Sequence, residues 1–238
     1  MKQKSQRFSW KSFLLPFALF IFTFCVYLHN LSQSVYGGDV GDLLSAIVVK
    51  GVAHPSGYPF FIILGIFANS IPVMMTTAGK VGLVSVFFSS VSVVIFYFTV
   101  LLLTQKKYIS FISALTLAFF YMFWLYAEIA EVFALASFFV EILVFLALLY
   151  YKKRKTVYLY FFSFFLGVSL THHEIIIATF PSLFFIILAT KWKIIREWKT
   201  ILFCILFGAL GLFPFLYIPL AASGHPIINW DNATTLQN

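Results

Sequence analysis

This sequence has few charged residues. Only 10% of its 238 residues are charged, whereas 62% are hydrophobic and phenylalanine alone occurs 32 times. A chain with so little charge cannot cover a folded surface with groups that water solvates, which excludes an ordinary water-soluble domain. The composition instead predicts an all-α polytopic membrane protein.

Cysteine is almost absent. Cys25 and Cys204 are the two cysteines, and both lie inside hydrophobic runs. Their spacing matches neither a cysteine metal site nor a redox motif, so we interpret both as packing residues.

Acidic residues are also scarce, with 8 against 16 basic residues and a net charge of +8. In a soluble protein this balance would favour a nucleic-acid partner. Here the basic residues form short clusters between hydrophobic runs, which is the pattern of cytoplasmic loops in membrane proteins. We therefore expect no nucleic-acid partner.

The hydrophobic runs predict seven membrane-spanning helices with a cytoplasmic N-terminus (1–12), an outer loop (32–57) and an outer-side tail (223–238). The expected spans are approximately residues 13–31, 81–103, 109–127, 130–151, 157–171, 175–190 and 200–222.

Residues 58–72 are too short for a clear span, and charge decides their placement. If this segment stays on the outer side, 14 of the 16 basic residues lie in the cytoplasm; if it crosses, only 5 do. The positive-inside rule therefore predicts a re-entrant or juxtamembrane helix at 58–72.

One polar stretch, residues 37–59, stands out from this background. Asp39 and Asp42 lie in it among glycines that free the backbone, and prolines stiffen its end. The residues from Asp42 to Lys50 predict a short amphipathic helix that lies on the membrane surface. The plainer interpretation is that one acid caps this helix and the other is a solvated loop residue.

Two further polar groups lie at predicted outer hairpin tips. One contains Glu128 and Glu131, which are either site residues or ordinary surface acids. The other contains His172, His173 and Glu174, which could bind a metal ion or line a polar pocket. His54 before Pro55 either belongs to the same outer site or caps the bend, and Glu141 lies within a span.

These motifs together resemble the transmembrane protein 260-like family, also called domain of unknown function 2723. GDVGD at 38–42 followed by GVAHPSGYP at 51–59 is similar to the family's main signature. Further segments are similar to family motifs in the same order: EVFAL at 131–135, GVSLTHH at 167–173, PFLYIPL at 214–220 and PIINW at 226–230.

The resemblance implies a glycosyltransferase of the GT-C type, with residues 13–222 forming its seven-span module. Family members of this type move mannose from a polyprenyl-phosphate donor to a protein hydroxyl on the outer or lumenal face, with inversion. The expected partners are membrane lipid, the lipid-linked sugar donor and a protein acceptor. The host decides between the plasma membrane of a bacterium and the endoplasmic reticulum of a eukaryote.

The resemblance also suggests roles for single residues. Asp39 is expected to be the catalytic base, with Asp42 or Glu131 orienting the acceptor or carrying a divalent metal ion, if the reaction uses one. Lys80 is the expected cation for the leaving phosphate, with histidines as further donors. The substrate-binding set would be His54, Tyr58, Lys80, Glu131, His172, His173 and Trp230, and a groove between 58–72 and the spans would hold the lipid tail.

The sequence departs from the family pattern at Ser56 and Leu220, where proline and arginine are usual. Its end at Asn238 suggests a truncated chain. Two other functions remain open. One is a transporter or flippase for a lipid-linked sugar, with Glu128, Glu131, Glu141 and the 172–174 tip forming its path; the other is a membrane subunit without catalysis.

Overall fold

The computed structural model describes residues 11–232, and this part of the chain is helical without a named strand. In a hydrophobic sequence the helix is favoured because it pairs the backbone N–H and C=O groups within one segment. The α-helices are α1 (Lys11–Asn30), α2 (Val40–Val49), α3 (Pro59–Asn69), α4 (Thr77–Thr104), α5 (Lys107–Ala118), α6 (Tyr121–Ala127), α7 (Phe133–Lys153), α8 (Val157–Leu170), α9 (Phe180–Thr190), α10 (Trp198–Gly211) and α11 (Tyr217–Ser223). Short 3₁₀ helices are η1 (Glu174–Thr179), η2 (Trp192–Arg196), η3 (Phe213–Leu216) and η4 (Trp230–Asn232).

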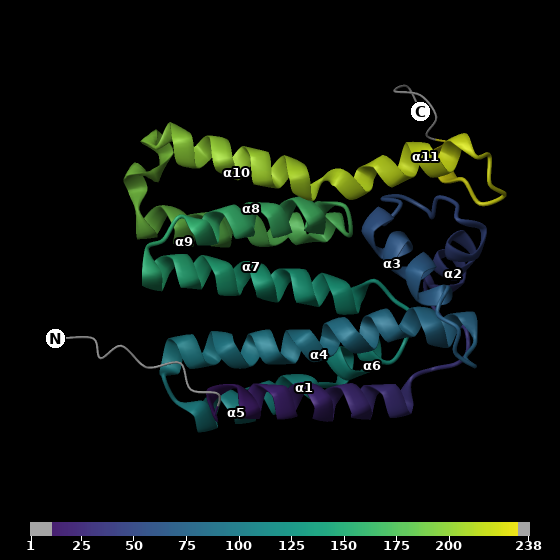
Figure 1. Ribbon diagram of the computed structural model, residues 1–238, viewed down its shortest axis with the longest axis horizontal. Helices are drawn as coiled ribbons and strands as arrows, with labels where there is room; N and C mark the ends of the chain where they lie inside the picture. Colours follow the sequence, from purple (N-terminus) through teal and green to yellow (C-terminus); the bar gives the residue numbers. More distant parts are fainter. Residues whose placement is uncertain (1–10, 233–238) are drawn as a thin grey trace.

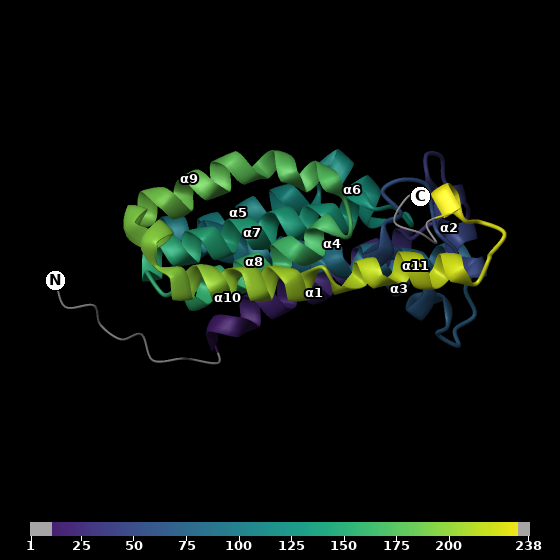
Figure 2. The same cartoon turned by 90° about the horizontal axis from the view of Figure 1, so that it is seen from above.

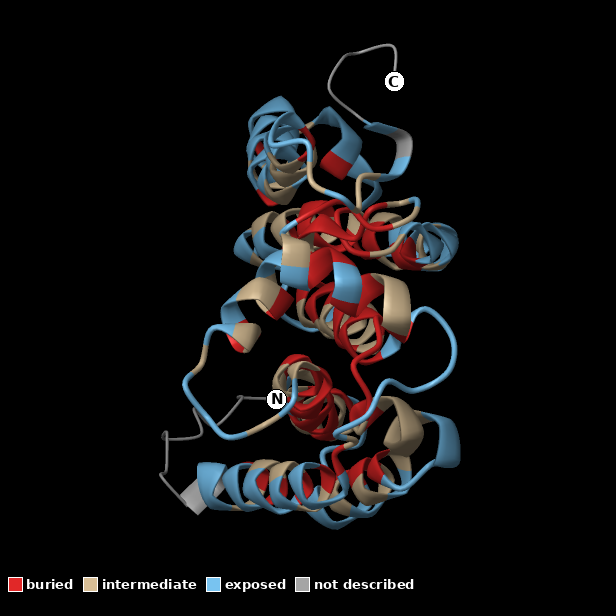
Figure 3. Ribbon diagram, turned by 90° about the vertical axis from the view of Figure 1, so that its right-hand side faces the viewer, coloured by how far each residue is buried: buried red, intermediate tan, exposed pale blue. Residues whose placement is uncertain are grey.

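The long helices form a row in which α1, α4, α7, α8 and α10 lie side by side (Figure 1). Seen from above, α9 lies to one side of this row (Figure 2). Buried residues follow the middle of the row, while α1 and α10 at its edges are largely exposed (Figure 3). This distribution is typical of a bundle whose outer surfaces face lipid.

Small residues allow α8 and α10 to approach closely. A Cβ atom at Gly167 would lie 2.2 Å from the Gly208 carbonyl oxygen, and one at Gly211 would lie 2.3 Å from the Phe164 carbonyl oxygen. Only glycine fits at such distances, which is how helices without a large hydrophobic driving force pack in a membrane.

The protein is an all-α polytopic membrane protein, but the number of spans needs comment. Within residues 11–232, four segments are long and apolar enough to cross a membrane: Phe13–Asn30, Thr77–Thr104, Phe133–Lys153 and Trp198–Ser223. The predicted span 109–127 is broken into α5 and α6, which meet at a bend of 67° and give a fifth crossing if counted together. At 14 residues α8 is about 21 Å long against a hydrocarbon core of about 30 Å. The seven-span count therefore stays a prediction.

The two ends of the bundle differ. The basic connections α4–α5, α7–α8 and α9–α10 lie at one end, while α2, α3 and α11 lie at the other (Figure 1). The predicted cytoplasmic residues 1–10 and the last six residues of the predicted tail, 233–238, lie outside the described part of the chain.

Two segments of the outer loop fold as short helices. The helix predicted from Asp42 begins at Val40, and 58–72 contains α3. The apolar face of α2, formed by Leu43, Leu44, Ile47 and Val48, was expected to contact the membrane. Its first three residues are buried because α3 and α4 cover them, whereas Val48 stays exposed. Both short helices are therefore integral to the end of the bundle that carries the acids.

Candidate functional site

The first acid of the loop, Asp39, lies immediately before α2. Gly38 precedes it with φ of +78°, a left-handed conformation that glycine adopts without strain. The Asp39 side chain remains 58% exposed, and its Oδ2 is 3.6 Å from Nε2 of His54. A carboxylate with this exposure is accessible to a substrate.

The second acid, Asp42, lies in the first turn of α2 and accepts three hydrogen bonds. The His54 backbone N–H and ring Nδ1 donate to Oδ2 over 3.0 and 2.7 Å, and the Trp230 indole N–H donates to Oδ1 over 3.0 Å. Burial acts to raise the pKa of Asp42, but the hydrogen bonds from His54 and Trp230 outweigh it and lower the pKa. Asp42 is therefore held ionised and fixes the orientation of the His54 ring.

Glu131 comes from the corner between α6 and α7 and is only 3% exposed. Its Oε1 accepts the backbone N–H of Asp39 and its Oε2 accepts that of Val132, each over 3.1 Å. Burial raises its pKa, against the effect of these two hydrogen bonds. The corner predicted from the sequence thus meets the outer loop directly.

The far end of the described chain also pairs with the loop. Val52 N–H donates to the Ile228 carbonyl over 3.0 Å, Trp230 N–H donates to the Val52 carbonyl over 3.3 Å, and Val52 and Asn229 form a parallel bridge. A Cβ atom at Gly51 would lie 2.1 Å from the Ile228 carbonyl oxygen, so only glycine permits this approach. This pairing places the indole of Trp230 against Asp42.

An aromatic group adjoins the acids. The Tyr58 ring lies 5.2 Å from that of His54, 5.6 Å from His173 and 6.5 Å from His172, measured between centroids. Burial, followed by the nearby carboxylate of Asp39, raises the pKa of Tyr58, so its phenol remains a hydrogen-bond donor.

The two histidines differ in environment. His172 is fully buried, and its Nε2 donates to the Val132 carbonyl over 2.8 Å. Burial lowers its pKa to about 3, so the ring is neutral. His173 is half-buried and its Nδ1 accepts the Ile175 N–H over 3.3 Å, which leaves Nε2 as the donor of the neutral ring. His172 thus supports the site from within, whereas His173 can face a ligand.

An apolar groove opens beside this aromatic group. It has a volume of about 620 Å³ between α6, α7 and η1, and Phe133, Ile175 and Val140 are among its lining residues. The Phe133 ring at the groove lies 6.2 Å from that of His173, which joins the groove to the site. Glu141 lies within it, and its buried Oε2 has no hydrogen-bond partner among the described residues.

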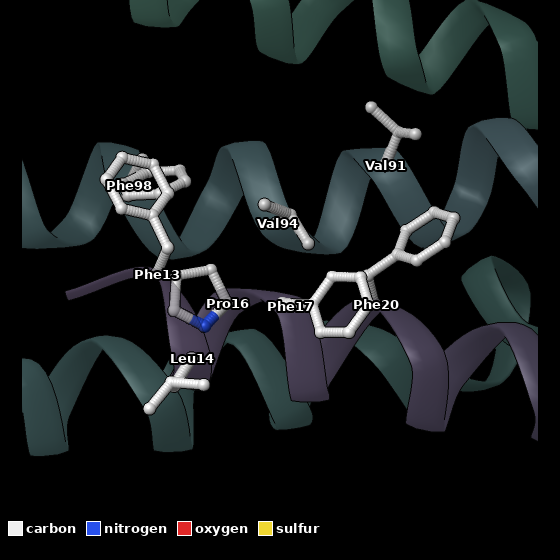
Figure 4. A pocket seen from close by; sticks show the side chains of 8 residues that line it. All are labelled: Phe13, Leu14, Pro16, Phe17, Phe20, Val91, Val94 and Phe98. Carbon is white, nitrogen blue, oxygen red and sulfur yellow. The ribbon is translucent and has the colours of Figure 1, made fainter. Parts of the chain in front are cut away.

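A second apolar groove, about 540 Å³ in volume, lies between α1 and α4. Its side chains come from the first half of α1, Phe13 to Phe20, and from Val91 to Phe98 of α4 (Figure 4). These residues belong to the end of each helix that is farther from Asp39 (Figure 1). This groove therefore does not adjoin the acids.

The structure brings together most of the residues that the sequence singled out. Asp39, Asp42, His54, Tyr58, Glu131, His172, His173 and Trp230 form one connected group through the contacts above.

Two predicted residues are not joined to that group. Lys80 Nζ donates to the Asn69 carbonyl at the end of α3 over 3.5 Å. Glu128 instead accepts the Trp124 indole N–H. Neither contact involves a member of the connected group of eight residues.

Sequence reasoning assigned no role to Tyr217 or Gly51. The Tyr217 hydroxyl donates to the Gly51 carbonyl over 2.9 Å and so supports the loop from the segment after α10. The PFLYIPL and GVAHPSGYP motifs contain these residues, but neither motif indicates that the two segments meet.

Within residues 11–232, no group of three or more His, Cys, Asp or Glu side chains is arranged to hold a metal ion. A role for Asp42 or Glu131 as a metal ligand stays a prediction from the sequence.

Comparison with known proteins gives consistent results. The model of the family described as "Protein O-mannosyl-transferase TMEM260 N-terminal domain" matches residues 39–196. The Dictyostelium discoideum protein named "Protein O-mannosyl-transferase tmem260" is 27% identical over 237 residues, covering 91% of this chain and 29% of the relative. The mouse protein of the same name is 27% identical over 232 residues, covering 92% of this chain and 32% of the relative. The chain thus spans about three tenths of the length of these relatives, and no solved structure matches it.

Proposed function

Because this chain belongs to the family of the protein O-mannosyl-transferase TMEM260 N-terminal domain, we propose that it transfers mannose to a hydroxyl group of a protein. The donor is a polyprenyl-phosphate mannose and the enzyme is of the GT-C type. The reaction takes place on the outer or lumenal face, at the end of the bundle opposite the basic connections. The host's membrane, plasma membrane or endoplasmic reticulum, sets the compartment.

The observation that carries this proposal is the Asp39 carboxylate, which is exposed while its own backbone is held by a buried acid. In the reaction the acceptor oxygen forms a bond to the anomeric carbon while the bond from that carbon to the phosphate oxygen breaks. The phosphate leaves with the electron pair, and the configuration inverts. Asp39 takes the proton of the acceptor hydroxyl as positive charge develops on the sugar.

His54 and Asp42 support this base. Asp42 fixes the His54 ring through Nδ1, so that Nε2 faces Asp39 at 3.6 Å. In this position His54 can receive the proton that Asp39 has removed, which restores the base for the next cycle.

The groove between α6, α7 and η1, which contains no residue of 58–72 and so differs from the predicted lipid groove, supports the assignment of a lipid-linked donor. Its apolar lining suits an isoprenoid chain, and its site-facing end is marked by Phe133 next to His173. We place the donor phosphate between this end and Asp39, where the Nε2 donor of His173 and the Tyr58 hydroxyl can bind it. Lys80, the cation first expected there, already binds the end of α3.

The experiment compares the complete wild-type protein in detergent with Asp39→Asn, using labelled polyprenyl-phosphate mannose and a protein acceptor. We expect transfer to fall by about 10²- to 10⁴-fold while donor binding persists, because the amide cannot take the proton. Glu128→Gln is the matched control, since it removes a carboxylate whose hydrogen-bond partner is Trp124 and not Asp39.

Undiminished transfer by Asp39→Asn would refute the role of Asp39 as base. If the wild type binds the donor but transfers nothing, a carrier of the lipid-linked sugar becomes the better interpretation.

A further inference from the structure

Glu131 is a buried carboxylate without a strong cationic partner. It is 3% exposed, and none of the ion pairs found in residues 11–232 includes it. A buried charge is costly unless hydrogen bonds compensate it. Here the compensation is two backbone N–H groups, one on each oxygen.

These two N–H groups belong to different parts of the chain. Val132 is the next residue along the α6–α7 corner, but Asp39 lies 92 positions earlier, in the outer loop. Glu131 therefore fastens the loop to the corner at the residue whose side chain is the proposed base.

The loop is shaped to meet this carboxylate. Gly38 adopts φ of +78°, and a Cβ atom there would lie 3.0 Å from Oε1 of Glu131. The glycine thus serves both the turn and the close approach of the acid. Glu131 is itself held from behind, since His172 donates to the Val132 carbonyl over 2.8 Å.

We propose that Glu131 is a positioning residue of the transferase, which holds Asp39 by its backbone N–H so that the exposed carboxylate meets the acceptor hydroxyl. This inference rests on the proposed function for its catalytic consequence. The contact of Glu131 with Asp39 can be tested without that function.

The chemistry requires a carboxylate of this length. Glutamine offers one oxygen acceptor and one NH₂ group, so Glu131→Gln leaves one of the two backbone N–H groups facing another donor. Aspartate is shorter by one carbon–carbon bond, about 1.5 Å, and does not reach both groups.

The first measurement is hydrogen–deuterium exchange of the complete protein in detergent, followed in peptides that cover residues 37–42. We expect the Asp39 N–H to exchange at least about tenfold faster in Glu131→Ala than in the wild type, because alanine has no oxygen to accept it. Gly38→Ala displaces the same contact from the loop side without changing a charge and should give the same result. It also serves if Glu131→Ala does not fold.

Glu128→Gln is the matched control for this measurement. It changes an acid three residues away at the same corner, whose carboxylate is bound to Trp124. Unchanged exchange in both Glu131→Ala and Gly38→Ala, or equal acceleration in Glu128→Gln, would overturn the proposed contact.

The second measurement is steady-state transfer. A displaced base lowers kcat, by about 10- to 100-fold, while KM for the donor changes by less than about twofold. A general loss of structure would instead change both constants or the amount of folded protein. A normal kcat with a loosened Asp39 N–H would refute the positioning role, whereas absence of transfer in the wild type would refute the proposed function and leave the exchange result intact.

Discussion

The indole N–H of Trp230 donates to Oδ1 of Asp42 over 3.0 Å, although 188 residues separate the two in the sequence. Trp230→Phe keeps the aromatic ring and removes this donor. Because Trp230 is half exposed, we expect the free energy of unfolding to fall by no more than about 1 kcal/mol. Unfolding in detergent measures this, with Trp198→Phe at the opposite end as control, and equal effects of the two variants would contradict the prediction.

The pairing of residues 51–52 with 228–230 predicts a strong effect of Gly51→Ala. The added methyl group meets the Ile228 carbonyl oxygen, so the segment that carries Trp230 must move away. We expect a loss of stability of about 1 to 3 kcal/mol. Gly37→Ala is the matched control, because no atom lies within 4 Å of the position of its Cβ. Similar stability of the two variants would show that the pairing tolerates displacement.

The position of the lipid groove predicts that Ser137→Phe weakens donor binding. The phenyl ring would occupy space between α6, α7 and η1 that we assign to the isoprenoid chain. Displacing about two methylene groups raises KM for a long-chain donor about tenfold and leaves a short-chain donor unaffected. Val94→Phe fills the groove between α1 and α4 and should leave KM unchanged for both the long-chain and the short-chain donor. An equal rise in KM for both donors would place the lipid chain elsewhere.

Two carboxyl groups predict opposite contributions of pH to stability. The pKa of Asp42 is lowered in the fold, so its contribution is present above the ordinary aspartate pKa and is lost as pH falls through the lowered value. The pKa of Glu131 is raised, chiefly by burial, so its contribution is present below the ordinary glutamate pKa and is lost as pH rises through the raised value.

The pH dependence of kcat should have the opposite sign, because ionised Glu131 offers two acceptor oxygens, whereas its protonated form carries an O–H donor on one of them. We expect kcat to fall as pH falls through the raised pKa of Glu131, and Glu131→Gln to lack this limb of the profile. Other titratable groups also face this region, namely Asp39, Asp42, His54, Tyr58 and His173. Glu128→Gln therefore serves as the control for Glu131→Gln and should keep the limb. If Glu131→Gln shows the same fall in kcat at the same pH, the limb belongs to another group.

Much of the fold followed from the pattern of hydrophobic runs and basic clusters. The all-α class is confirmed, and the predicted short helix in the outer loop is present as α2. The bend between α5 and α6 was not foreseen, because residues 119–120 are both phenylalanine and carry no proline or glycine signal. The burial of α2 under α3 and α4 was also missed, since an amphipathic pattern does not distinguish lipid from protein as its apolar partner.

The residues that form the site were easier to predict than the contacts between them. Local spacing and the family motifs indicated Asp39, Asp42, His54 and Glu131, which the structure joins. That Glu131 contacts the backbone of Asp39, or that Tyr217 reaches Gly51, depends on how distant helices pack. No local pattern records such contacts.

The bridge between Val52 and Asn229 also determines when the site can be completed during synthesis. Synthesis runs from the N-terminus, so the chain from α3 to α11 is made after Asp42 and before Trp230. Throughout that interval the loop lacks its final indole donor and the strand-like pairing at Val52. The loop therefore gains these two contacts only after the chain from α3 to α11 has been made.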